Sequence, residues 1–564
     1  MMVHVLAWAV VPFLILLVSQ DHHSKTWCTV PRFLCVMVLL ELEDIKSSPL
    51  FWVITMKKLL LIVVFIVACS LDTIAQRYME EGGQELNLSA QVEKSFDNLK
   101  KGDKVTFTKM VVIRNDRYSD DIYLWSGENI KNKYIFKDVI NNCKFEYNNL
   151  QQFWDTQVLV NVMPNRSIYG YQSELRSELE EEAISYIYQM KSNGSEFKDP
   201  YLESYIYTLV NKISPCYLID DRPVNLNLLL LNDPSMNACC FPNGTIVLNT
   251  GLLAQLHSED ELAAVLSHEI AHFVMDHTIV NIFKEIERQE RAQFWAGVAT
   301  ALAAAAEIAI SANNDYYVPG GLTAGVAFAS FNITNSVIKR LGMEYNKEQE
   351  SAADATAVEV LKLLGYDENA MSTVLGRMYE SYKADHYYYM INLQSTTHPS
   401  LASRIEKSGK ANLNHVNVDF EKQVSFAVTN AALQKYYYRR FSQVIPLVNQ
   451  NIKNNVATAE DYILKANCLL STSNTSESNN EVYALINKAK SIEPNNINIY
   501  KAEIIAMLRL GKNQEAVNML EDYITNLDLL LKGCENTTER IYNNTFSFVS
   551  HEQDWAKKMI IKLK

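Results

Sequence analysis

The chain has 564 residues, of which 48% are hydrophobic and 21% are charged. This composition excludes a disordered or collagen-like protein, and the length predicts three or four domains. The 65 acidic residues outnumber the 52 Lys and Arg residues, which gives a net charge of −13. We therefore expect no nucleic-acid partner, because neutralising phosphates requires a basic surface.

The first 75 residues differ in character from the rest of the chain. Two lysines follow Met56 and precede a run of apolar residues that ends in small residues. This order is typical of a bacterial secretory signal, so we interpret 56–75 as a signal peptide and 1–55 as a non-native upstream extension. The alternative is a genuine extension that carries a membrane anchor.

The residues around Cys69 also resemble a lipobox, in which this cysteine would be acylated. The competing interpretation is that Cys69 is one more residue of the apolar signal core. Both predict an exported protein of the bacterial envelope, either in the periplasm or lipid-anchored to a membrane, where peripheral membrane association is expected.

Hydrophobic periodicity divides the exported part of the chain. Alternation over 76–168 predicts a small, β-rich N-terminal domain, and Ser173–Met190 and Asp199–Ile213 have helical spacing. Pro223–Leu231 and Thr245–Asn249 have the composition of strands. The fold class is accordingly α+β and mostly α, with a domain at 169–410 between the β-rich domain and a helical domain at 411–564.

Two segments allow more than one interpretation. The small-residue-rich apolar runs within 291–345 predict an α-hairpin packed on the domain, with a membrane-dipping pair as the alternative. The spacing within 411–564 resembles tetratricopeptide (TPR) repeats with a Ser/Asn-rich insertion at 471–480, and an undifferentiated helical tail is the alternative. A TPR-like region would bind a protein partner.

The strongest chemical signal is the motif His268-Glu269-x-x-His272. Ser258 and Glu261 form a predicted capping box, so a helix is expected to begin just before the motif. Residues four apart lie one turn above each other on a helix, so the two imidazoles can share one Zn²⁺. Glu269 can then reach a zinc-bound water without being a ligand. A bare motif of this kind arises by chance in on the order of one per cent of such chains.

A third ligand decides the class of site. Met275 and Thr278 stand where a metzincin would have Gly and His, and His277 is out of helical register and is predicted to be structural. Glu350 lies downstream in a helix-favouring stretch and can coordinate the metal. Asp354, one turn later, can hold the second ring nitrogen of a ligand histidine.

Four motifs in chain order resemble those of a known family. They are the turn Pro242–Ile246 before the zinc helix, His268–His272, Glu350–Asp354, and Thr397-His398-Pro399 with Arg404-Ile405. Together they are similar to the HtpX-like and CAAX-prenyl-protease-like zinc endopeptidases, which are gluzincins of peptidase family M48. The resemblance covers roughly 170–410, and the chain looks most like exported members with helical-repeat tails.

The resemblance implies one zinc ion per chain, bound by His268, His272 and Glu350. It also implies that Glu269 is the general base and that Asp354 supports a ligand. His398 and Arg404 match a family motif near the active site, and His398 would either mask the metal, bind substrate or form a turn. The chain departs from the family at Cys239-Cys240, where less oxidisable residues are expected.

The resulting hypothesis is a zinc metalloendopeptidase that hydrolyses unfolded or misassembled envelope proteins. Polypeptides, unfolded or membrane-associated, are the expected partners, and the strand around Thr245–Asn249 is expected to hold an extended substrate by edge addition. The alternative is an envelope chaperone or scaffold with a silent metal site and a partner-binding tail. A self-inhibited protease, covered by 291–345 or by the His398 loop, is a third hypothesis.

Overall fold

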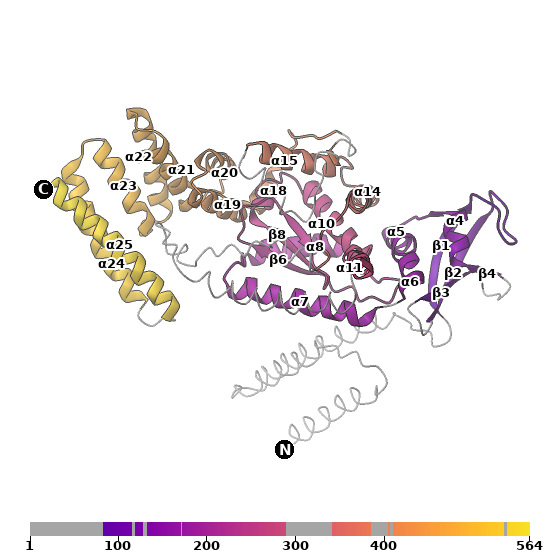
Figure 1. Cartoon of the computed structure of the whole chain (residues 1–564). Coiled ribbons are helices and arrows are strands. Elements are labelled where there is room, and N and C mark those ends of the chain that lie inside the picture. Colours follow the sequence, from indigo (N-terminus) through magenta and orange to yellow (C-terminus); the bar gives the residue numbers. More distant parts are fainter. Residues whose placement is uncertain are drawn as a thin grey trace, which may run out of the picture. The chain divides into compact units, whose positions relative to one another are not determined.

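The computed structural model describes residues 83–114, 119–127, 132–170, 172–288, 341–384, 404–405, 410–534 and 539–564. The expected signal peptide, Cys69, most of the segment 291–345 and His398 lie outside these ranges. Within them, no helix combines the length and apolarity needed to cross a bilayer. The chain is mostly helical, with a small β region at its N-terminal side and a helical C-terminal region (Figure 1).

Five antiparallel strands form the first sheet, in the order β4-β3-β2-β1-β5. Buried residues alternate with more exposed ones along β1 and β3, so each of these strands buries one face. The strands are β1 (Gln84–Val92), β2 (Lys104–Arg114), β3 (Asp120–Trp125), β4 (Lys133–Ile135) and β5 (Cys143–Glu146).

Helices replace strands in the second half of the region expected to be β-rich. They are α4 (Phe136–Asn142), α5 (Leu150–Gln157), the π-helical turn Val158–Val162 and α6 (Met163–Tyr169). Trp154, Val158 and Val162 recur at four-residue spacing and are buried, which gives this stretch a helical apolar face. The β-rich interpretation therefore holds only up to β5.

A second, three-stranded sheet stands beside the predicted zinc helix. Its order is β6 (Asn227–Leu231), β8 (Thr245–Asn249) and β7 (Ala238–Cys240). β8 pairs in parallel with β6 and antiparallel with β7, so both of its edges are occupied. The expectation that β8 receives a substrate by edge addition is therefore wrong, because an added strand needs unpaired backbone groups. The edge strands of this sheet are β6 and β7.

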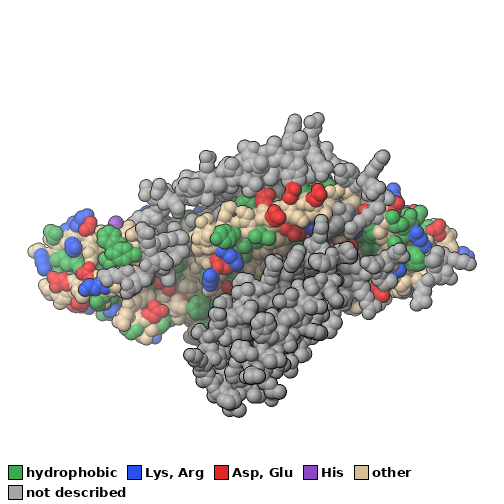
Figure 2. All heavy atoms as spheres, turned by 90° about the horizontal axis from the view of Figure 1, so that it is seen from below, with side chains coloured by type: hydrophobic (Ala, Val, Ile, Leu, Met, Phe, Trp, Pro, Cys, Tyr) green, Lys and Arg blue, Asp and Glu red, His purple; other side chains and the backbone are tan. Residues whose placement is uncertain are grey.

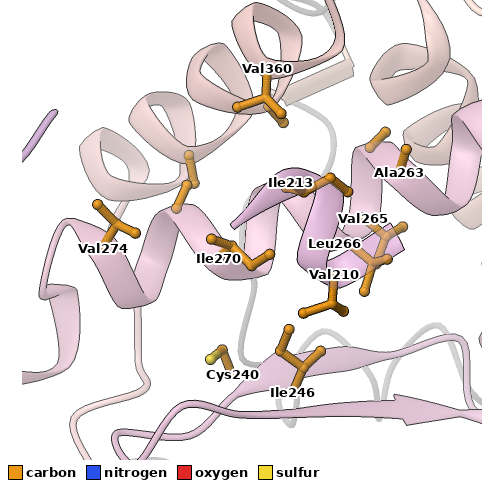
Figure 3. Close-up of a cluster of buried hydrophobic side chains, with 14 of the residues drawn as sticks. Val210, Ile213, Cys240, Ile246, Ala263, Val265, Leu266, Ile270, Val274 and Val360 are labelled. Carbon is orange, nitrogen blue, oxygen red and sulfur yellow. The ribbon is translucent and has the colours of Figure 1, made fainter. Parts of the chain in front are cut away.

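Helix α10 (Glu259–Val274) is buried over almost its whole length. Figure 3 shows apolar side chains along it, from Ala263 to Val274, facing Val210 and Ile213 of α8 (Pro200–Ile213), Ile246 of β8 and Val360 of α14 (Lys347–Leu364). Apolar residues on several faces make α10 the central element of its domain. A polar side chain on α10 is therefore held in a buried position by packing on all sides.

The start of α10 is capped on one side only. The Ser258 hydroxyl accepts a hydrogen bond from the backbone N–H of Glu261, as expected. The reciprocal half of the predicted capping box is absent, because the Glu261 carboxylate accepts from the backbone N–H of His257 and from Arg377 of α15 (Ala370–Ala384). Glu261 thus links α10 to α15 and does not cap the start of α10.

The C-terminal region consists of consecutive helices that pack on their neighbours in sequence (Figure 1). They are α18 (Val418–Gln423), α19 (Ser425–Tyr437), α20 (Phe441–Lys453), α21 (Ala459–Thr472), α22 (Ser476–Ile492), α23 (Ile497–Arg509), α24 (Asn513–Gly533) and α25 (Glu539–Leu563). Within the Ser/Asn-rich stretch 471–480, residues 471–472 end α21, residues 473–475 connect the two helices and residues 476–480 begin α22, which Thr475 caps.

One hydrophobic core joins the N-terminal β region, the central domain and helices α18 to α21. Polar contacts accompany it, including a hydrogen bond from Thr250 of α9 (Thr250–Leu253) to Asn430 and a 2.6 Å contact between His257 and Glu421. On the face drawn in Figure 2, acidic and basic side chains of the described residues are interspersed, without a continuous basic patch.

Candidate metal centre

Two histidines of α10 point their ring nitrogens at the same place. The Nε2 atoms of His268 and His272 are 3.1 Å apart, and the rings meet edge to face. Both side chains are buried. The expected geometry of residues one helical turn apart is therefore realised within the domain interior, where a bound ion would be shielded from solvent.

The third donor comes from a different helix. Glu350 lies in the first turn of α14, which begins with a complete capping box between Asn346 and Gln349. Its carboxylate oxygens are 3.6 Å from His272 Nε2 and 3.7 Å from His268 Nε2. One atom from each of the three side chains lies within 4.8 Å of the others. Packing between α10 and α14 thus completes a three-donor cluster that the sequence could only suggest.

These separations suit a small tetrahedral ion. Metal–ligand bonds of about 2.0–2.1 Å place the donors of a tetrahedron about 3.3–3.4 Å apart. The two histidine nitrogens are 3.1 Å apart, and each lies 3.6 or 3.7 Å from one of the two Glu350 oxygens, which is close to that value. Two imidazoles and one carboxylate are also a donor set used by catalytic metal sites. The residues present therefore fit a single metal ion.

Asp354 and Arg404 contact the side chains of this cluster and hold them in position. Asp354 Oδ1 is 3.0 Å from Nδ1 of His268, the ring nitrogen opposite the shared one. Arg404 donates two hydrogen bonds to the Asp354 carboxylate and lies 2.7 Å from Glu350 Oε2. Burial opposes ionisation of Asp354, but the hydrogen bond from His268 and the charge of Arg404 hold its pKa well below the usual value. Asp354 is consequently an anion that orients His268.

His277 holds the other histidine, a contact that sequence analysis missed. Its Nδ1 is 2.8 Å from Nδ1 of His272. Burial lowers the pKa of His277 to about 4, although the Glu350 and Asp276 carboxylates act against this shift. His277 is therefore neutral near pH 7. When His272 keeps the lone pair of Nε2 for a metal, its Nδ1 carries the proton and donates to His277.

A helical wheel cannot describe the position of His277, because α10 ends before this residue. α10 stops at Val274, and Asp276 has a φ of +57°, which turns the chain before α11 (His277–Arg288) begins. A tight turn brings His277 back towards the ring of His272. The turn signal in the sequence is weak, since it contains neither Gly nor Pro.

Two arginines fix that turn. Arg176 of α7 (Ser173–Ser192) forms a two-pronged ion pair with Asp276, and Arg222 lies 3.5 Å from the same carboxylate. Arg222 also donates to the carbonyl oxygens of Phe273 and Val274 at the end of α10. Cations at this position satisfy free carbonyls and favour the negative end of the helix.

Glu269 is buried beside the donor cluster. Burial raises the pKa values of Cys239, Cys240 and Tyr345, and the negative charge of Glu269 is the second largest cause of the increase. This places the Glu269 carboxylate near β7. Tyr345 stacks on the ring of His272 at 3.7 Å and was also missed by sequence analysis. Neither cysteine of this pair forms a disulfide in the structure.

The structure therefore assembles His268, His272, Glu350, Asp354 and Arg404 around one point, with Glu269 on the same helix as the two histidines. These features define a candidate mononuclear metal centre of the His-Glu-x-x-His type with a downstream glutamate. Residues 204–410 match peptidase family M48, so the chain carries a domain of this family.

Relatives agree with this assignment. A Vibrio cholerae protein is 27% identical over 224 residues, which is 40% of this chain and 42% of that protein. A beta-barrel assembly-enhancing protease of Yersinia pestis is 28% identical over 195 residues, 34% of this chain and 36% of the relative. Mitochondrial metalloendopeptidase OMA1 of Arabidopsis thaliana is 40% identical over 63 residues, 11% of this chain and 13% of the relative. In each case this chain matches less than half of the relative's length.

Proposed function

We propose that this protein is a zinc metalloendopeptidase that hydrolyses unfolded or misassembled polypeptides of the bacterial envelope. The convergence of His268, His272 and Glu350 within a buried, packed domain carries the proposal. Membership of residues 204–410 in a peptidase family and the names of the bacterial relatives support the reaction class and the compartment.

Each residue of the site has a role in this proposal. His268, His272 and Glu350 hold the zinc ion, while Asp354 and His277 fix the two rings. Bound zinc would supply Lewis-acid activation of water and of the scissile carbonyl. Arg404 neutralises part of the charge that Glu350 and Asp354 share and keeps both carboxylates in place. His398 stays a candidate for masking the metal or binding substrate.

Glu269 acts as the general base. It takes a proton from the attacking water and then delivers that proton to the nitrogen of the departing amine. A buried carboxylate next to the donor cluster is suited to this shuttle, because bulk water does not compete for the proton. The intact pair of His-Glu-x-x-His and Glu350 gives no support to a scaffold with a silent site.

The position of β7 suggests how a substrate is held. This edge strand packs against α10, and the Glu269 charge acts on both of its cysteines. An extended polypeptide that pairs with β7 would lie alongside the catalytic helix. Main-chain pairing selects for unfolded segments and is tolerant of sequence, which agrees with a quality-control protease.

The C-terminal helices are proposed to be TPR-like. Adjacent helices pack as antiparallel pairs, and the pairs α21/α22 and α23/α24 follow one another along the chain. Arrays of this kind present extended surfaces to partners. With an exported location, either periplasmic or lipid-anchored through Cys69, the helical region would serve as a partner-binding region of the proposed peptidase.

The decisive experiment compares the chain from Gln76 with its Glu269→Gln and His268→Ala variants. Each is incubated with casein as an unfolded substrate, and bound zinc is quantified. The parent should cleave with about one zinc per chain. Glu269→Gln should retain zinc and lose about 10²–10⁴-fold in turnover, whereas His268→Ala should lose the metal. Undiminished cleavage by Glu269→Gln would exclude its role as the base. Zinc in both parent and Glu269→Gln, with cleavage in neither, would favour a masked or non-proteolytic site.

A further inference from the structure

A cavity in the C-terminal helical region is independent of the metal centre. It has a volume of about 260 Å³ and is bounded by α19, α21, α23, α24 and α25. Aromatic side chains contribute much of its wall, namely Tyr436, Tyr437, Tyr523 and Phe548. Small-molecule sites commonly occupy about 300–1,000 Å³, so this cavity is closer in size to one long side chain with its adjoining backbone.

Most of the charges in the cavity wall are already satisfied. Lys501 forms an ion pair with Glu552 at 2.8 Å, and the Tyr523 hydroxyl donates to the second oxygen of the same carboxylate. Arg509 donates to the carbonyl oxygens of Leu470 and Ser473 at the end of α21. These groups link neighbouring helices and have little capacity left for a ligand.

Glu460, in the first turn of α21, is different. Its only hydrogen-bond partner among the described residues is the Asn498 side chain, and no Lys, Arg or His of those residues pairs with it. The charges that act on it, from Asp461 and Glu493, are negative. Burial and these two carboxylates raise the pKa of Glu460 to about 7. Asp461, by contrast, is held by Thr429, Asn451 and Thr458.

The surroundings of Glu460 are those of a receptor for a cation. Glu460, Tyr436 and Tyr437 line the same cavity, and besides burial the charge of the Glu460 carboxylate raises the pKa of both tyrosines. A carboxylate beside aromatic faces suits a guanidinium or ammonium group, which gains an ion pair and cation–π contacts together. A bound cation would also remove the electrostatic cost of the uncompensated carboxylate.

We propose that this cavity binds an arginine or lysine side chain of an extended polypeptide, with Glu460 as its counter-ion and the tyrosines as its walls. The size of the cavity favours one side chain of a larger molecule over a free metabolite. The proposal concerns binding alone and does not depend on the peptidase activity.

The test uses the intact chain carrying Glu269→Gln, so that no peptide is cleaved. Two fluorescein-labelled peptides are titrated, one of sequence Ala-Leu-Arg-Phe-Ala and one with citrulline, the neutral isostere, in place of arginine. Fluorescence anisotropy should show the arginine peptide binding at least about tenfold more tightly, as expected for one charge-assisted hydrogen-bonded pair. This comparison needs no change in the cavity and so cannot be confused with misfolding.

A second step locates the binding. Adding Glu460→Gln should remove the preference, so that both peptides bind equally weakly. The matched control Glu477→Gln, at an exposed residue of α22, should leave the preference intact. Three outcomes would overturn the proposal: equal binding of the two peptides by the parent, a preference that survives Glu460→Gln, or displacement of the arginine peptide by spermidine at equal concentration, which would indicate a small-amine site.

Discussion

The central domain and the C-terminal helices bury ionisable groups in contrasting ways. In the central domain they converge, so that Arg404 contacts both Glu350 and Asp354 and the latter contacts His268. In the C-terminal region they are dispersed as separate links, such as Lys501 with Glu552. A convergent arrangement gathers several buried groups at one point, where they can act on one ligand, whereas a dispersed pair links one helix to another. Glu460 is the exception in the second region, and the proposed binding site there depends on it.

The two regions nevertheless share a core. Phe420, Val424 and Val428 belong to the same buried cluster as Leu252 and Leu262 of the central domain. Arg377 adds polar links, because it pairs with Glu261 and donates to backbone carbonyls of the segment before α18. The two regions therefore differ in how they use buried charges but depend on one hydrophobic core. The largest predicted effect follows from this shared core.

Removing the C-terminal region should unfold the peptidase domain. A chain of residues 83–410 would expose the apolar surface that α18, α19 and α20 now cover, at a cost larger than the usual stability of a domain of about 5–15 kcal/mol. We expect no cooperative thermal transition by circular dichroism and no stoichiometric zinc. A chain ending at Ser473, which keeps α18 to α21, should retain both. Cooperative melting of 83–410 would show that the shared core is dispensable.

Breaking the convergence at Asp354 should weaken metal binding without unfolding the protein. Asp354→Ala leaves His268 unoriented and removes one of the two carboxylates that Arg404 contacts. Loss of such a supporting partner reduces metal affinity by about 10–100-fold. Competition with a chromogenic chelator measures the change. Asp419→Ala, at an exposed residue of α18, is the matched control. Equal zinc affinities for the Asp354 and Asp419 variants would remove Asp354 from the site.

Replacing His277, which contacts the second histidine ligand, should lower zinc affinity less than replacing Asp354 does. His277→Phe removes the acceptor for the Nδ1–H of His272 and should lower zinc affinity by about tenfold. His277→Gln offers an amide oxygen instead and should recover part of the affinity. A purely structural role would predict similar losses in melting temperature without this recovery, so zinc affinity and the melting temperature of the metal-free protein are measured together.

The sequence predicts the centre of the site better than its support. His268, Glu269 and His272 are adjacent on one helix, and local spacing is enough to place them. Glu350 is assigned through its spacing in a second helix and a family resemblance. By contrast, the turn at Asp276 depends on Arg176 and Arg222, which are distant in sequence. Local sequence patterns do not predict contacts of this kind.

Errors in the fold have a similar origin. The composition of Thr245–Asn249 correctly predicts a strand, but it cannot predict that β8 lies at the centre of its sheet, because strand order is a property of the whole sheet. Glu261 has the spacing of a capping box, yet Arg377 competes successfully for its carboxylate. In both cases a tertiary partner overrides a pattern that is correct locally.

The smallest predicted effect tests whether Glu460 is uncompensated in the free protein. Its pKa is about 7 in the folded state, against about 4.3 for an unfolded chain. Between these values the folded state keeps a proton that the unfolded state has lost, so its stability relative to Glu460→Gln falls as pH rises from about 4.5 to 7.5. Urea unfolding of both proteins at pH 5 and pH 8 measures this difference, and titration of all other groups cancels in the comparison. The partial exposure of Glu460 makes the change modest. Parallel behaviour of the two proteins would mean that water or a neighbouring group already stabilises the carboxylate, and the argument for a cationic ligand would then lose its electrostatic basis.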